Sequence, residues 1–340
     1  PDEYVDQAYS TVLAGATELM RFHAMDILPG TSHDALLIEF DKHGPHIEAL
    51  ARRIHGRLPL GVIAYKPAYS SAGDEEYFFD FLGEMGVPIN ATAHFPATRK
   101  NASVLLTRSA LHDANIDRKV VEWSTAGGNV VATTGFLAGA SREVHDLFGL
   151  RSVRSKPVDG VELQVDGQTV ALPEPLALGG FLEPRTADVR LACRVGRQRV
   201  PVLTAATTST GAFAVAINLR THEGRDGVEG LLTERPVTWL DLPEPAANSL
   251  RETVLEGTGL TMKAPSRVVA HALTGGLLVL INTRDTPTPV SLKLGLPWYA
   301  ASGEALVIEP GGERVQPSGD GSFQLTLPPR ARWSLLLSGK

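Results

Sequence analysis

The chain has 340 residues, a length that predicts more than one domain. Hydrophobic residues make up 43% of it and charged residues 21%, which is typical of globular proteins and argues against wholesale disorder. The formal net charge of −6, and the lack of an apolar run near the roughly 20 residues that span a bilayer, argue against nucleic acid and membranes as partners.

The first residues predict an amphipathic helix. Apolar side chains recur there at spacings of three and four, the period of one helical face: Tyr4, Val5, Ala8, Tyr9, Val12 and Leu13. Because this helix begins at once, without an initiator methionine or a signal-peptide pattern, we expect the chain to be part of a larger protein. A strand at residues 18–25 and a helical stretch at 33–54, broken near Gly44-Pro45, are expected next.

Strands and helices are predicted to alternate in the following part of the chain. The expected strands are apolar on both faces and cover residues 60–65, 102–107 and 129–135. The expected helices cover residues 75–86, 117–126 and 141–148. Buried strands that alternate with helices indicate a parallel sheet covered on both sides. The predicted fold class is therefore α/β, with a flavodoxin-like parallel sheet.

The rest of the chain has mainly β patterns. Short β segments separated by Gly and Pro turns are expected from about residue 158 to 204. The run at 213–219 predicts a strand that returns to the α/β sheet, and residues 246–256 predict a helix. Turn signals every 8–12 residues in the stretch from 265 to 340 indicate a small β-sandwich.

The α/β part carries no motif for a familiar chemistry. No Gly-rich phosphate-binding motif follows any of its predicted strands. A glutamine amidotransferase needs a nucleophilic Cys at a sharp turn between strand and helix, and the corresponding turn here carries Thr134. Cys193, the single cysteine, lies far along the chain and is interpreted as a small buried apolar side chain in a cytoplasmic protein. We predict no catalytic residue in this part.

Two histidines are close enough in the sequence to suggest a metal site. His43 and His46 are three residues apart, with Asp41 and Glu48 nearby. The intervening Pro45 disturbs their helical spacing, and no second cluster of His and carboxylates supports the site. We therefore expect these side chains to lie on a solvated face, and we predict no metal and no cofactor.

Two groups of polar residues follow predicted strands and are candidate sites. Phe22, His23 and Asp26 come at the end of the strand at 18–25, where an aromatic face and polar groups suit a sugar, although a buried structural His is an equally good interpretation. The second group lies in the loop that leads into the helix at 75–86, and a subunit interface is favoured there over a ligand loop. Its members are Lys66, Tyr69, Ser70, Ser71, Asp74 and Glu75.

Three segments resemble a known family of glycosidases. PDEYVDQAYSTVLAGATELMRFHAM resembles the end of the catalytic barrel of family 42-type β-galactosidases. YKPAYSSAGDEEYFFDFLGEMGVPI and LLTRSALHDANIDRKVVEWSTAGGNVVATTGFL are similar to the trimerisation domain of that group. The resemblance implies the remnant of a (β/α)8 barrel at 1–56, then a class I glutamine amidotransferase-like trimerisation domain at 57–260 with a β-rich insertion at about 158–205, then a β-sandwich at 261–340.

The resemblance also implies a function. In the family, two Glu residues act as acid/base and nucleophile, about 5–5.5 Å apart, and both come from barrel strands that would precede Pro1. The chain is then the non-catalytic oligomerisation portion of an enzyme for β-galactosides or related glycosides, a homotrimer or other homo-oligomer, and inactive alone. Phe22, His23 and Asp26 would be substrate-subsite residues. The alternative is a stand-alone carbohydrate-binding or interaction protein with a degenerate amidotransferase-like domain.

Overall fold

The computed structural model describes residues 2–16, 34–71, 73–97, 100–220, 242–295, 305–309 and 311–337. The strand expected at 18–25, and with it Phe22, His23 and Asp26, lies outside the described residues. Within the described part, no helix has the combination of length and apolar composition that crossing a bilayer requires.

Among the described residues, nine strands form the largest sheet, in the order β3-β2-β4-β5-β12-β11-β10-β7-β8. The first five of these pair in parallel, and the predicted parallel sheet is confirmed. Their bounds are β2 Val62–Tyr65, β3 Ile89–Thr92, β4 Ser103–Leu106, β5 Asn129–Thr133 and β12 Phe213–Ile217. Numbered along the chain, these strands lie in the order 2-1-3-4-5, which is that of one class of doubly wound sheets.

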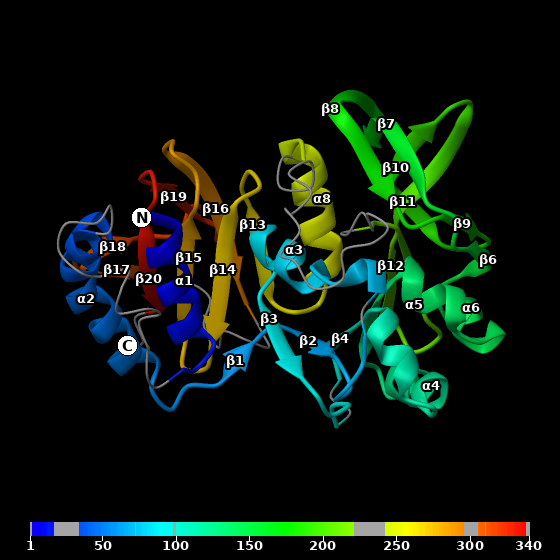
Figure 1. Ribbon diagram of the computed structural model, residues 1–340, viewed down its shortest axis with the longest axis horizontal. Coiled ribbons are helices and arrows are strands. Elements are labelled where there is room, and N and C mark those ends of the chain that lie inside the picture. Colours follow the sequence, from blue (N-terminus) through cyan, green and yellow to red (C-terminus); the bar gives the residue numbers. More distant parts are fainter. Residues whose placement is uncertain are drawn as a thin grey trace.

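Helices cover both faces of this parallel part (Figure 1). Val62, Ala64 and Leu105 point into one core, with α3 (Phe78–Glu84) and α8 (Glu244–Val254). Neighbouring strand residues point into the opposite core, because successive side chains of a strand alternate between faces. That second core contains side chains of three helices: α4 Ile116–Thr125, α5 Thr134–Gly139 and α6 Arg142–Leu147.

The predicted β segments after residue 158 continue the same sheet with antiparallel pairing. They project beyond the helices as long hairpins (Figure 1). Their bounds are β7 Val158–Val165, β8 Gln168–Leu178, β10 Asp188–Val195 and β11 Gln198–Thr207. A separate pair is formed by β6 (Leu150–Arg154) and β9 (Phe181–Pro184).

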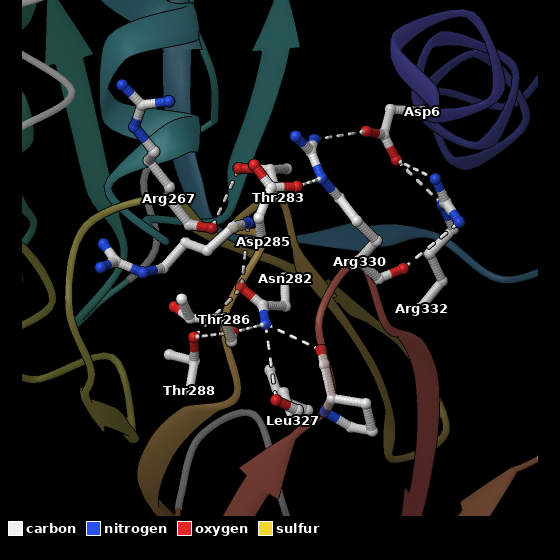
Figure 2. Close-up of polar contacts among 12 residues, drawn as sticks. Asp6, Arg267, Asn282, Thr283, Asp285, Thr286, Thr288, Leu327, Arg330 and Arg332 are labelled. Atoms are coloured by element: carbon white, nitrogen blue, oxygen red, sulfur yellow. Dashed lines mark hydrogen bonds and ion pairs between the residues drawn. The ribbon is translucent and has the colours of Figure 1, made fainter. Parts of the chain in front are cut away.

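The C-terminal strands form two sheets that share one core. One has the order β1-β14-β15-β20-β17-β18 and the other the order β13-β16-β19. The bounds are β1 Pro59–Leu60, β13 Leu260–Lys263, β14 Val268–Leu273, β15 Leu277–Asn282, β16 Thr288–Leu294, β17 Leu306–Glu309, β18 Glu313–Val315, β19 Phe323–Leu327 and β20 Arg332–Leu337. At one end, the Asn282 amide donates to the carbonyls of Thr286 (3.0 Å) and Pro328 (2.8 Å) and ties two loops together (Figure 2).

Two helices cover the other face of the larger C-terminal sheet: α1 (Asp2–Leu13) and α2 (Asp34–Ile54). The expected break at Gly44-Pro45 is wrong, because α2 runs through Pro45. A residue before proline is normally driven out of the helical region by a clash with its own Cβ, and Gly44 has none. Burial of Ile47, Leu50 and Ile54 against the sheet stabilises the helix beyond the proline.

Arg251 of α8 joins the parallel sheet to the C-terminal sheets. Its buried guanidinium donates to the carbonyls of Met85 (2.5 Å), Met262 (3.0 Å) and Ala264 (3.2 Å). Burial lowers the pKa of Arg251 to about 10. Because Met85 is the C-cap of α3 and Met262 lies on β13, the side chain links the helices of the parallel sheet to the C-terminal sheets.

Candidate functional site

The carboxyl ends of β2, β4 and β5 meet at one edge of the parallel sheet. The strand order reverses between β2 and β4, and ligands of doubly wound sheets bind at this switch point. The chain places Glu75 there, in a short 3-10 turn at Gly73–Glu75 that precedes α3. The helix predicted at 75–86 is therefore shorter than expected and begins only at Phe78.

The side chain of Glu75 points into the protein, and the residue has a relative solvent accessibility of 4%. Its Oε2 accepts hydrogen bonds from the Arg108 backbone N–H and from the Thr133 hydroxyl, each over 2.7 Å. Its Oε1 accepts one from the Gly135 backbone N–H over 2.9 Å. Such short hydrogen bonds to a carboxylate are stronger than neutral ones. We call the Arg108 N–H, the Gly135 N–H and the Thr133 hydroxyl the carboxylate cradle.

Gly135 is required for this approach. A Cβ at that position would overlap Oε1 of Glu75. Thr133 is the N-cap of α5, and its hydroxyl also accepts from the Phe136 N–H over 3.3 Å. The end of β5 and the start of α5 are thus built around the incoming carboxylate.

Thr134, at the turn where an amidotransferase carries its nucleophile, is committed to a structural network. Its hydroxyl donates to Oδ1 of Asn218 over 2.9 Å, and both side chains are buried. The Asn218 amide donates in turn to the carbonyls of Gly180 (2.9 Å) and Pro201 (2.8 Å). These contacts connect the start of α5, the turn before β9, strand β11 and the end of β12, and they leave the hydroxyl directed away from solvent.

The structure separates the six residues predicted for this loop. Glu75 is buried in the cradle, whereas Lys66 and Tyr69 are exposed, and the side chain of Asp74 lies outside the description. The Ser70 hydroxyl donates to the Pro67 carbonyl over 2.5 Å, and the Ser71 hydroxyl accepts from the Gly73 N–H over 3.3 Å. These bonds lie within the loop and define its shape.

Tyr69 has an unusual backbone conformation. Its φ of 58° lies in the left-handed region, which residues with a side chain rarely adopt. Its side chain is fully exposed, with a relative accessibility of 106%. The loop therefore holds an aromatic ring away from the protein surface, next to the carboxyl edge of the sheet.

Other ionisable groups near the edge are paired. The Tyr65 hydroxyl donates to Oδ2 of Asp113 over 2.9 Å, and Lys119 approaches the same oxygen at 2.6 Å. Burial, together with the Asp113 carboxylate, raises the pKa of Tyr65 to about 12. Burial alone would raise the pKa of Asp113, but the hydrogen bonds from Lys119, Asn115 and Tyr65 lower it below its usual value.

Two histidines near the sheet lie against backbone carbonyls, and the cysteine is buried. His112 Nδ1 lies 3.2 Å from the Ser109 carbonyl, and His145 Nε2 lies 2.6 Å from the Leu137 carbonyl. Cys193 is buried on β10, as interpreted from the sequence, and burial raises the pKa of its thiol to about 11. His43 lies on α2, with its ring 6.3 Å from that of Tyr9. No group of three or more His, Cys, Asp or Glu residues in the described segments is arranged to hold a metal ion.

The fold of this chain is similar to that of solved β-galactosidase structures. A β-galactosidase from Rahnella sp. R3 superposes with a TM-score of 0.54 at 14% identity, over 98% of this chain and 51% of that one. Two structures of Gan42B, a GH42 β-galactosidase from G. stearothermophilus, give TM-scores of 0.53 and 0.52 at 12% and 13% identity, over 94% of this chain and 47% of theirs. The chain shares its fold with about half of a GH42 β-galactosidase.

The resemblance seen in the sequence is thus confirmed at the level of the fold. The sequence matches no protein-family model and no curated protein. The order of the parallel strands places Glu75 at the switch point, whereas the sequence favoured a subunit interface for its loop and kept a ligand loop at the sheet end as the alternative. The signal for its true position was the Thr133-Thr134-Gly135 turn, which leaves backbone N–H groups at the sheet edge in need of an acceptor.

Proposed function

We propose that this chain is the non-catalytic oligomerisation and scaffold portion of a glycoside hydrolase for β-galactosides or related glycosides. The observation that carries the proposal is the shared fold, which extends over nearly all of this chain and about half of the GH42 β-galactosidases. In this proposal the other half of the enzyme, a (β/α)8 barrel, supplies the two catalytic Glu residues. Residues 1–56 would be the end of that barrel, and residues 57–260 an amidotransferase-like trimerisation unit.

The contacts of Glu75 and Thr134 at the carboxyl edge of the parallel sheet support a role other than catalysis for this chain. The switch point, where a doubly wound sheet would bind a ligand, is filled by the Glu75 carboxylate. The Thr134 hydroxyl at the turn after β5 is bonded to Asn218 instead of to a base. A nucleophile needs an adjacent base and an approach for the substrate, and neither is present among the described residues of this edge.

The loop at residues 66–71 is the proposed contact between subunits. An exposed Tyr supplies a large contact area with little loss of side-chain entropy, and Tyr is enriched at the centre of protein interfaces. Tyr69 meets this description, since its ring is fully exposed and its position is set by the hydrogen bonds around it.

Three measurements on the purified chain test the proposal. Light scattering coupled to size-exclusion chromatography is expected to show a stable oligomer at micromolar concentration. Hydrolysis of a nitrophenyl β-galactoside is expected to stay at the level of a blank. A monomer at every concentration would contradict the oligomerisation role, and turnover of the galactoside would contradict the non-catalytic one. Heat released on titration with free galactosides would instead support a stand-alone carbohydrate-binding protein.

A further inference from the structure

We infer that the cleft between the C-terminal ends of α1 and α2 and the strands β1, β3 and β14 is a binding site for small uncharged alcohols or phenols, and that His271 recognises their hydroxyl group. Three features of the cleft carry this inference: its size and apolar wall, a buried nitrogen without a partner, and the charged groups at its rim. The site is independent of the proposed oligomerisation.

The cleft has the size of a small-molecule site. Its volume is about 840 Å³, and such sites typically measure roughly 300–1,000 Å³. α1 and α2 lie side by side, with their C-terminal ends toward β1 (Figure 1). Apolar side chains of both helices and of β14 line much of the wall: Val12, Leu13, Ile54 and Leu273. A wall of this kind favours a ligand with an aliphatic or aromatic body.

His271 of β14 is a polar residue among these apolar side chains. It lies two positions before Leu273 and therefore on the same face of the strand, the one that α1 and α2 cover. The residue is partly exposed and lines the cleft, but its Nε2 atom is buried and lacks a hydrogen-bond partner within the part of the chain that the structure describes. A buried polar atom without a partner destabilises the folded protein, and a ligand that supplies the partner removes this cost.

A hydroxyl is the ligand group that suits this nitrogen best. Burial lowers the pKa of His271 to about 4, so its imidazole is uncharged at neutral pH. In an uncharged imidazole one nitrogen donates a hydrogen bond and the other accepts one. A hydroxyl can donate to Nε2 in one tautomer and accept from it in the other, whereas a carbonyl oxygen can only accept and an ammonium group can only donate. An alcohol or a phenol therefore satisfies His271 in both tautomers.

The charged groups at the rim favour an uncharged ligand. Nη1 of Arg57 donates to the carbonyls of Thr274 (2.6 Å) and Gly275 (3.0 Å). Arg52 forms an exposed ion pair with Glu48 over 3.4 Å. These two guanidinium groups disfavour a cation in the cleft. The C-terminal ends of α1 and α2 carry partial negative charge and disfavour an anion.

Binding of three probes to the purified chain at neutral pH tests the inference. p-Cresol, toluene and p-toluate share one methylated ring and differ in carrying a hydroxyl, no polar group or a carboxylate. Amide chemical shifts measure the affinities. p-Cresol should bind with a dissociation constant on the order of 1 mM, and toluene about tenfold more weakly, because it leaves Nε2 unpaired. p-Toluate should bind more weakly than p-cresol. Absence of p-cresol binding, or binding of p-toluate as tight as that of p-cresol, would overturn the inference.

Replacement of His271 assigns the recognition of the hydroxyl. His271→Leu keeps a side chain in the wall but removes both nitrogens, so this variant should bind p-cresol and toluene about equally. The matched control is His55→Leu, at an exposed position of the rim, which should keep the preference for p-cresol. The same preference in His271→Leu as in the wild type would show that His271 does not recognise the hydroxyl.

A second variant covers the case in which His271→Leu does not fold. Ala51 of α2 is partly exposed and lines the cleft, so a Trp at this position would occupy part of it. Ala51→Trp should lose most of its affinity for p-cresol. Ala49→Trp, at an exposed position of the same helix outside the cleft, should bind p-cresol like the wild type. Unchanged affinity in Ala51→Trp would place the binding elsewhere on the protein and reject the site.

Discussion

Asp6 on α1 and Arg332 on β20 form an ion pair across 326 positions of the chain, in which two guanidinium nitrogens donate to one carboxylate oxygen. Oδ1 of Asp6 accepts hydrogen bonds from Nε of Arg332 over 2.9 Å and from Nη2 over 2.6 Å (Figure 2). The Arg332 side chain is 6% exposed and also lies over the ring of Tyr9, 5.0 Å from its centroid. The pair therefore fixes α1 on the C-terminal sheet.

Replacement of Asp6 by Asn is expected to destabilise the protein by about 3 kcal/mol, because it leaves the Arg332 guanidinium buried without its counter-ion. Urea denaturation measures the change. The control is Glu48→Gln, which breaks an ion pair with Arg52 whose side chains are about 70% exposed, and which should change stability by at most about 0.5 kcal/mol. Similar losses for both variants would show that the buried pair contributes no more than a surface one.

Gly135→Ala is expected to lower the free energy of unfolding by about 2 kcal/mol, although alanine normally favours a helix over glycine. The reason is the overlap between the new Cβ and the Glu75 carboxylate, which must leave the cradle. In a Glu75→Ala background the same substitution should be close to neutral. Equal effects in both backgrounds would mean that the two residues are not coupled.

The control for this substitution is Gly83→Ala in α3. A Cβ at Gly83 meets nothing within 4 Å, so the variant should be as stable as the wild type or more stable, by up to about 1 kcal/mol. Chemical denaturation of the wild type, the three other single and double variants at positions 75 and 135, and Gly83→Ala under one set of conditions gives all the values needed. Destabilisation by Gly83→Ala would indicate a general intolerance of helical glycines to alanine and remove the support from the Gly135 result.

The parallel sheet could be predicted from the sequence because its central strands are apolar on both faces. β4 and β5 are buried at every position, as expected for central strands of a sheet that is covered on both faces. β3 was not predicted, because Ile89–Thr92 lies at the sheet edge, is only partly buried and lacks the apolar run. The strand expected at 60–65 merges Leu60 of β1 with β2, since a pair of residues that bonds to β14 more than 200 positions away has no local signal of its own.

The candidate site could be predicted only in part. The loop containing Glu75 was singled out, but a row of acidic residues before a helix is typical of a solvated helix start. What turns Glu75 inward is the set of donors brought together by β4, β5 and α5, which exists only after the sheet has formed. Pairings of this kind depend on the tertiary structure and have no periodicity to reveal them.

His271 on β14 is expected to make the protein sensitive to acid. Its Nε2 is buried and has no hydrogen-bond partner among the residues that the structure describes, and burial lowers the pKa of His271 from 6.5 to about 4. Between these values the unfolded chain binds a proton that the folded protein does not, so stability falls as the pH drops from 6.5 towards 4. The loss of unfolding free energy attributable to this residue is at most about 3 kcal/mol.

Urea unfolding of His271→Leu over this pH range should show a smaller loss of stability than the wild type, whereas His55→Leu, at an exposed position, should follow the wild type. Parallel curves for all three proteins would assign the acid sensitivity to other groups.

Tyr69→Ala is expected to weaken the proposed oligomer without unfolding the subunit. Truncation of a Tyr at the centre of an interface lowers the binding free energy by about 2 kcal/mol, which corresponds to a roughly 30-fold increase in the dissociation constant. The Tm of the isolated subunit should be unchanged or slightly higher, because Ala has a smaller side chain in the same left-handed conformation at an exposed position. Sedimentation at several protein concentrations measures the dissociation constant. Val161→Ala, at an exposed position on β7, is the matched control and should assemble like the wild type. If Tyr69→Ala assembles as well as Val161→Ala, the subunit contact lies elsewhere on the protein, and the exposed ring of Tyr69 needs another explanation.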